Sequence, residues 1–144
     1  MSEENVQLVR ESYATSSASA TRSSGEMIEQ RGLFASWAER MTPSTEFDFT
    51  AVYPDRPVMR GIEELRRFRE EGPWEKLSFE AERFFDVDNE RVLVFVRVDA
   101  RGKGSGVPVE LRNAHEFTIR EGVLVRFKVY GDRDDALEAA GLDV

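Results

Sequence analysis

The chain has 144 residues, of which 40% are hydrophobic, so it can bury a real core as one domain and is not a disordered chain. A formal net charge of −8 disfavours nucleic acid and anionic membranes as partners, because both attract clusters of Lys and Arg. The chain has no cysteine, no run of about 20 apolar residues and no signal-peptide pattern, so we expect a cytoplasmic protein without disulfides, a thiol nucleophile or a membrane span.

The first third of the chain has the apolar spacing of helices. This spacing predicts a helix around residues 6–13 and a second over residues 27–41. The second ends before Pro43, because a residue that precedes proline is pushed out of the helical region. The Ser/Thr-rich stretch near residues 15–25 is either an extended loop or a weak continuation of the first helix.

The rest of the chain alternates with the period of strands. We predict a strand over 45–53, a short helix over 61–71, and then an antiparallel meander. The four strands of this meander are expected at residues 77–87, 91–100, 107–120 and 123–130. A terminal helix over 132–140, ended by Gly141, completes an α+β pattern in which residues 1–144 form a single domain.

Two polar residues interrupt an apolar face of the predicted strand 107–120. Asn113 and His115, the only histidine, fall on the same face as Phe117, because side chains alternate with period 2. A buried polar group costs about 1–3 kcal/mol unless it is hydrogen-bonded. These residues therefore indicate either a satisfied structural network or a pocket.

Three segments resemble SnoaL-like proteins of the NTF2-like superfamily. These are residues 3–13, residues 59–68 and, most specifically, residues 114–132. The resemblance covers nearly the whole chain except the Ser/Thr-rich stretch, which looks like an insertion. It implies a cone-shaped α+β fold, in which N-terminal helices cover a curved and mostly antiparallel sheet.

The resemblance further implies a small apolar ligand, no cofactor, and a homodimer formed through the outer face of the sheet. The superfamily includes ketosteroid isomerases, polyketide cyclases, limonene-epoxide hydrolases, scytalone dehydratases and non-enzymatic binding domains. The fold therefore leaves the function open. One histidine and no cysteine also give no basis for a zinc site.

The same resemblance implies catalytic residues. Arg97 and Asp99 match an Arg-x-Asp pair that, in limonene-epoxide hydrolases, faces the pocket and orients a further carboxylate and a water. An arginine would keep Asp99 ionised, although a structural ion pair or a solvated hairpin end is the alternative. Relatives carry an acid at the position of Val129, and its absence here argues against transferring either their hydrolase or their cyclase mechanism.

The register of the 91–120 hairpin decides whether these residues meet. A hairpin symmetric about Gly104 places Leu93 opposite His115, so that Arg97 and Asp99 share a face with His115. A slip of one residue would put Arg97 on the opposite face. We expect the symmetric register, because the resembled family places both sets of positions inside.

His115 and Asp48 are the remaining catalytic candidates. A neutral imidazole can act as a general base or a hydrogen-bond donor near pH 7, but His115 could equally be a core histidine bonded to a carboxylate or carbonyl. Asp48 lies near the catalytic Asp of ketosteroid isomerases, where with His115 or Tyr53 it could support proton abstraction beside a carbonyl. Strand alternation could instead turn it to solvent.

Two functions remain open. One is a cofactor-free isomerase, cyclase, dehydratase or hydrolase that acts on a small apolar substrate by acid–base catalysis. The other is a non-catalytic ligand-binding or dimerisation module. In either case the expected substrate-binding wall consists of Asn113, Trp37, Phe95, Leu111, Phe127 and Val129.

Overall fold

The protein is built on one strongly curved sheet. A computed structural model describes residues 2–20, 33–55, 58–72 and 74–142, and in this part of the chain the sheet has six strands in the order β2-β1-β6-β5-β4-β3. The strands are β1 (Glu46–Asp48), β2 (Met59–Arg60), β3 (Trp74–Asp86), β4 (Arg91–Gly102), β5 (Pro108–Arg120) and β6 (Val123–Tyr130). Strand β1 runs parallel to β6, and the other neighbours are antiparallel.

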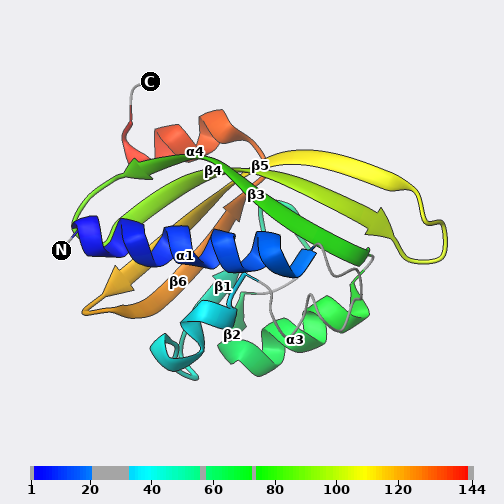
Figure 1. Ribbon diagram of the computed structural model, residues 1–144, viewed down its shortest axis with the longest axis horizontal. Helices are drawn as coiled ribbons and strands as arrows, with labels where there is room; N and C mark the ends of the chain where they lie inside the picture. Colours follow the sequence, from blue (N-terminus) through cyan, green and yellow to red (C-terminus); the bar gives the residue numbers. More distant parts are fainter. Residues whose placement is uncertain (1, 21–32, 56–57, 73, 143–144) are drawn as a thin grey trace.

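The helices cover both faces of this sheet (Figure 1). They are α1 (Ser2–Ala20), the 3-10 helix η1 (Ala35–Arg40), α3 (Gly61–Glu71) and α4 (Arg133–Ala140). Val9 and Tyr13 of α1 join the main core on the concave face, whereas Ala136 and Ala140 of α4 pack on the outer face. No helix in the described residues is long and apolar enough to cross a membrane.

Strand alternation separates the two faces. On β4, the inward residues include the four buried valines Val92, Val94, Val96 and Val98, which belong to the main core. Leu93 points outward and packs under α4 with Ala114 and Tyr130. The outer face therefore has a small apolar core of its own where α4 covers it.

The register of the β4–β5 hairpin differs by one residue from the symmetric one. Val94, not Leu93, lies opposite His115, and Arg97 lies opposite Arg112. The expectation that Arg97 and Asp99 share a face with His115 is therefore wrong. Gly104 and Gly106 have φ values of 80° and 66°, so the glycine-rich turn is free to centre between residues 104 and 105.

Most predicted elements are confirmed, with shifted ends. Helix α1 continues to Ala20, so the first part of the Ser/Thr-rich stretch is helical. The predicted strand 45–53 is confirmed only at Glu46–Asp48, because the backbone turns after it, with the amide of Val52 donating to the carbonyl of Phe49. The predicted helix 27–41 begins outside the described residues, and η1 is its described end.

Candidate functional site

The only histidine is buried on the concave side of the sheet. His115 is 2% exposed, and its Nδ1 lies 2.7 Å from the hydroxyl of Tyr13 on α1. The rings of Phe79 and Phe127 flank the imidazole, with centroids 5.6 and 4.8 Å away. The expectation that His115 faces inward is confirmed, and its partner is a phenol rather than a carboxylate or carbonyl.

Burial keeps both members of this pair uncharged. It lowers the pKa of His115 from its usual 6.5 to about 3, because an imidazolium would be stripped of water here. It also raises the pKa of Tyr13 well above that of an ordinary phenol. At neutral pH the pair is therefore a neutral imidazole and a neutral phenol, joined by one hydrogen bond. No hydrogen bond joins Nε2 of His115 to a described residue.

A chain of aromatic rings leads from His115 to the rim of the concave face. Phe127 contacts Phe49 at 5.9 Å between centroids, and Phe49 contacts Phe68 at 5.3 Å. Phe68 contacts Tyr53 at 5.2 Å, and the hydroxyl of Tyr53 accepts a 2.7 Å hydrogen bond from Nε1 of Trp74. An apolar wall thus connects the buried imidazole with the protein surface.

Burial along the concave face changes from one end to the other. Phe117 and Ile119, beyond His115 on β5, are almost fully buried. In the other direction Asn113 is half-buried and Leu111 is 36% exposed, although both point inward. The half-buried side chains at this end, together with the aromatic wall, form a partly solvated concave surface that we call the open end. Its members are Phe49, Tyr53, Phe68, Trp74, Leu77, Phe79, Leu111 and Asn113.

Arg97 and Asp99 lie on the outer face, away from His115. The guanidinium of Arg97 pairs with Glu80, with Asp99 at 3.4 Å and with Glu110 at 3.6 Å. The side chain of Arg97 is 35% exposed and that of Asp99 is 51% exposed. These contacts correspond to the structural ion pair that the sequence left open as the alternative.

Asp48 also lies outside the concave face. The inward residue of β1 is Phe47, and Asp48 turns to the other side, where it is 5% exposed. It accepts hydrogen bonds from Thr50 at 2.7 Å and from Arg126 at 2.8 Å. Burial by itself raises the pKa of Asp48, but these hydrogen bonds outweigh it, so the pKa lies below its ordinary value. The prediction that Asp48 could assist His115 has no support from this position.

The predicted wall residues divide between the two faces. Trp37, Phe127 and Val129 point into the core as expected, and Nε1 of Trp37 donates to the hydroxyl of Ser12. Phe95 was expected inside, but the one-residue change of register turns it outward, where its ring packs 4.8 Å from that of Phe85. Val129 lies directly opposite His115 in the sheet.

Arg133 of α4 reaches the strands that carry the site. Its guanidinium pairs with Glu82 and lies 4.7 Å above the ring of Phe95. It also donates to the backbone carbonyls of Val96 at 3.2 Å and Asn113 at 3.4 Å. These carbonyls are accessible because Glu82 forms a bulge beside Val96, and because the pairing of β5 with β6 begins only at residue 114.

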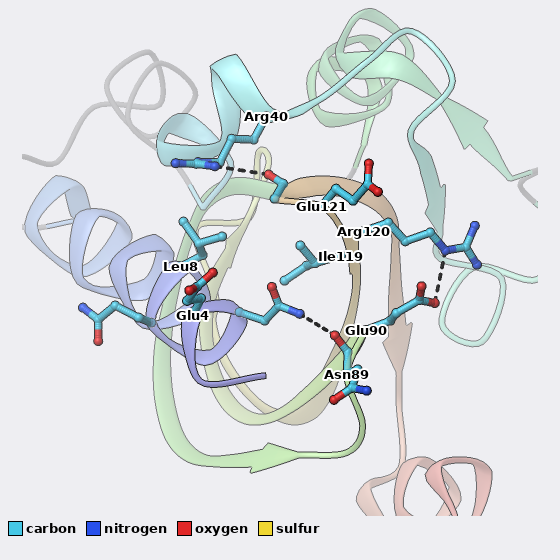
Figure 2. Close-up of a pocket in the computed structure, with 11 residues that line it drawn as sticks. Glu4, Leu8, Arg40, Asn89, Glu90, Ile119, Arg120 and Glu121 are labelled. Atoms are coloured by element: carbon cyan, nitrogen blue, oxygen red, sulfur yellow. Dashed lines mark hydrogen bonds and ion pairs between the residues drawn. The ribbon is translucent and has the colours of Figure 1, made fainter. Parts of the chain in front are cut away.

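A cavity of about 800 Å³ lies beside the Ile119 end of β5, whereas the open end lies toward Leu111 of the same strand. Figure 2 shows the residues that line this cavity. Leu8 and Ile119 form its apolar floor, and polar groups of α1 and of two strand turns surround it. The amide of Asn5 donates to the carbonyl of Asn89 at 2.9 Å, and Arg40 donates to the carbonyl of Gly122 at 3.3 Å. None of the predicted site residues lines this cavity.

Sequence reasoning missed Tyr13 as a functional residue. Tyr13 and His115 are 102 positions apart, and a tyrosine on the apolar stripe of a helix is an ordinary core residue. The one available signal was its position on the inward stripe with Val9, below a sheet that carries an unpaired polar residue. Trp74 was missed because the predicted strand began at residue 77, whereas β3 begins at Trp74.

Comparison with known proteins gives a consistent family. A family model for the SnoaL-like domain matches residues 26–127, which is more than half of the chain. No curated protein matches the chain. Several solved structures are similar over nearly the whole length.

One of these is a protein of Jannaschia sp. CCS1 described as a SnoaL-like polyketide cyclase, with a TM-score of 0.66, 20% identity, and coverage of 99% of this chain and 94% of that one. Another is SalBIII, an epoxide hydrolase/cyclase-like enzyme in salinomycin pyran ring formation, with a TM-score of 0.62, 15% identity and coverage of 94% and 97%. A limonene-epoxide-hydrolase-like enzyme of M. tuberculosis has a TM-score of 0.56, 11% identity and coverage of 94% and 90%. At these identities the likeness is one of fold, and it confirms the expected α+β cone of the NTF2-like type.

Proposed function

Because this chain belongs to the SnoaL-like family, we propose that it binds a small, largely apolar molecule at the open end of its concave face. The polar anchors would be His115 and Asn113, and the apolar wall would be the aromatic chain from Phe127 to Trp74. Ligand sites in proteins are mostly apolar with a few placed polar groups, which is the composition of this surface.

The Tyr13–His115 hydrogen bond is the observation that carries the proposal. A buried histidine usually satisfies both ring nitrogens, because an unpaired polar atom in an apolar core costs about 1–3 kcal/mol. Here Nδ1 is hydrogen-bonded to Tyr13, whereas Nε2 has no hydrogen-bond partner among the described residues and is not one of their fully buried unpaired atoms. A hydroxyl or carbonyl of a ligand could form a hydrogen bond with Nε2 of His115. Asn113, two positions along the same strand face, could bind a second polar group of the ligand.

Acid–base catalysis is the second candidate function, with His115 as the proton-transferring group. Of the four predicted catalytic residues, His115 is the one that faces the concave side. A general base works best with a pKa near the working pH, whereas burial holds the pKa of His115 at about 3. Binding therefore ranks above catalysis, and His115 acts first as a neutral hydrogen-bonding group.

The proposal can be tested with one steroid and one aromatic polyketide, for example estradiol and emodin. Ligand at about ten times its Kd should stabilise the fold by about 1.4 kcal/mol, which a thermal shift detects. The single histidine gives unambiguous ring ¹⁵N signals, so binding should also move the Nε2 resonance of His115. His115→Gln and Asn113→Leu should weaken binding, whereas the outer-face variant Arg97→Gln should not.

Two results would contradict this function. One is the absence of any stabilisation by either ligand class. The other is stabilisation with unchanged ring signals of His115, which would place the ligand elsewhere, for example in the cavity beside the Ile119 end of β5. A cytoplasmic location, expected from the composition, stays a prediction.

A further inference from the structure

The outer face of the sheet carries a second, polar groove. Its volume is about 390 Å³, which is within the range of small-molecule sites. Its lining comes from β1, β5 and β6, from the first residue of β4 and from the turn between β3 and β4. The lining residues are Glu46, Asp88, Glu90, Arg91, Glu116, Thr118, Arg120, Val125 and Arg126.

Most charges in this groove already have close partners. Arg91 is 2.9 Å from Asp88, and Arg120 is 3.1 Å from Glu90. Arg126 is 2.8 Å from Asp48, which lies next to the groove. The other two carboxylates of the lining have only longer contacts, since Glu46 is 3.9 Å from Arg60 and Glu116 is 3.7 Å from Arg91. Of these two, Glu46 is 37% exposed, whereas Glu116 is buried.

Glu116 is unusual because it is both buried and poorly paired. Its side chain is 7% exposed, and the nearest cationic atom of the described residues, Nη1 of Arg91, is 3.7 Å away, which is too long for a hydrogen bond. Oε2 of Glu116 accepts no hydrogen bond from any residue that the structure describes. Lys128, its direct neighbour across the strands, instead places its ammonium 4.9 Å from the ring of Tyr130. A carboxylate that is largely removed from water is best satisfied by a cation in direct hydrogen-bonding contact.

An unpaired donor lies in the same groove. Nε of Arg126 is buried and has no hydrogen-bond partner in the described part of the chain, because the pair with Asp48 uses Nη2. The lining residues therefore include one buried acceptor with negative charge and one buried donor, and neither has a hydrogen-bond partner among the described residues. A complementary molecule carries a positive donor and an oxygen acceptor a short distance apart.

We propose that this groove binds a small organic ammonium that also carries a hydroxyl or carbonyl oxygen. Its ammonium pairs with the carboxylate of Glu116, and its oxygen accepts from Nε of Arg126. An amino alcohol is the simplest such molecule. The site lies on the face opposite to His115, so this proposal stands apart from the apolar ligand of the concave face.

Ethanolamine is a suitable probe, with ethylene glycol and ethylamine as matched controls that lack the charge and the oxygen. We expect saturable, one-to-one binding of ethanolamine with a Kd of about 1 mM. The NMR signal of the Nε–H of Arg126 measures this binding. Ethylene glycol should fail to bind, and ethylamine should bind more weakly. Glu116→Gln should weaken ethanolamine binding at least about tenfold, whereas Glu110→Gln, on the same face outside the groove, should leave it unchanged.

Three results would overturn the proposal. Ethanolamine binding could be absent, it could survive Glu116→Gln, or ethylene glycol could bind equally well. Sedimentation of the same variants tests whether Glu116 contributes to a protein–protein interface and not to a small-molecule site. A dimer that Glu116→Gln dissociates, with no binding of ethanolamine, would assign the carboxylate to an interface and would also overturn the proposal.

Discussion

At the scale of single residues, burial decides which of the polar side chains can take part in function. His115 was identified from the sequence because it is the only histidine and interrupts an apolar strand face. Its phenol partner could not be identified, since no local pattern relates residues 102 positions apart. Arg97 and Asp99 carry the right chemistry for a hydrolase, but they lie among ion pairs on the outer face.

The buried imidazole should make stability depend on pH below neutrality. The pKa of His115 is about 3 in the folded chain and about 6.5 when unfolded, so between these values the unfolded chain binds a proton that the folded chain does not. Stability should therefore fall as the pH drops below about 6.5, by about 1.4 kcal/mol per pH unit from this residue.

Urea unfolding of the natural chain and of His115→Gln at several pH values between 7 and about 4 measures this contribution. The carboxylates are common to both chains and cancel in the difference. The natural chain should lose stability more steeply on acidification. If the free energy of unfolding depended on pH in the same way for both chains, the imidazole would be protonated over this pH range in the folded protein and hence hydrated.

At the scale of elements, sequence patterns predicted the order of helices and strands better than their registry. The period-2 pattern of the 91–120 hairpin fixes which residues of each strand share a face, but not how the two strands align. That alignment depends on the turn, and a turn with three glycines accepts several geometries. The observed turn shifts the pairing by one residue, which reverses the face of Arg97 relative to His115.

Val129 occupies the position at which the resembled relatives carry an acid, and it lies directly opposite His115. A carboxylate can therefore be introduced beside the imidazole at this position. Directly opposed residues in antiparallel strands have Cβ atoms about 4.5–5.5 Å apart, so Val129→Asp would place a carboxylate beside the imidazole. The opposite charge should raise the pKa of His115 by about 1–3 units, while burial of the new charge lowers stability.

An NMR titration of the single histidine measures this pKa, and Val129→Asn is the matched control without charge. In this control the pKa of His115 should stay close to its value in the natural chain. Equal values in the two variants would show that residue 129 does not contact the imidazole, and the assigned register of β5 and β6 would then be wrong.

At the scale of the whole molecule, the two faces of the sheet have different characters. The concave face is aromatic and encloses the Tyr13–His115 pair, whereas the outer face is apolar only under α4 and is charged elsewhere. The cone was predictable because residues 114–132 resemble the SnoaL-like family. The outer groove was not, since it depends on the register and on side chains from several strands.

The homodimer expected through the outer face stays a prediction. Sedimentation should give a mass of about twice the 16.5 kDa of one chain at high concentration. Because the uncovered part of this face is charged, raising the salt from about 0.05 to 0.5 M should weaken the association. A monomer at all concentrations, or a dimer indifferent to salt, would argue against an interface on this face.

Arg133 gives the C-terminal helix a position from which it can report on the opposite side of the sheet. It binds the backbone carbonyls of Val96 and Asn113, whose side chains point inward. A small movement of either strand on ligand binding would change those two hydrogen bonds. The position of helix α4 could thus change when a ligand binds on the concave face. A fluorophore attached to α4 would then detect this binding without contacting the ligand.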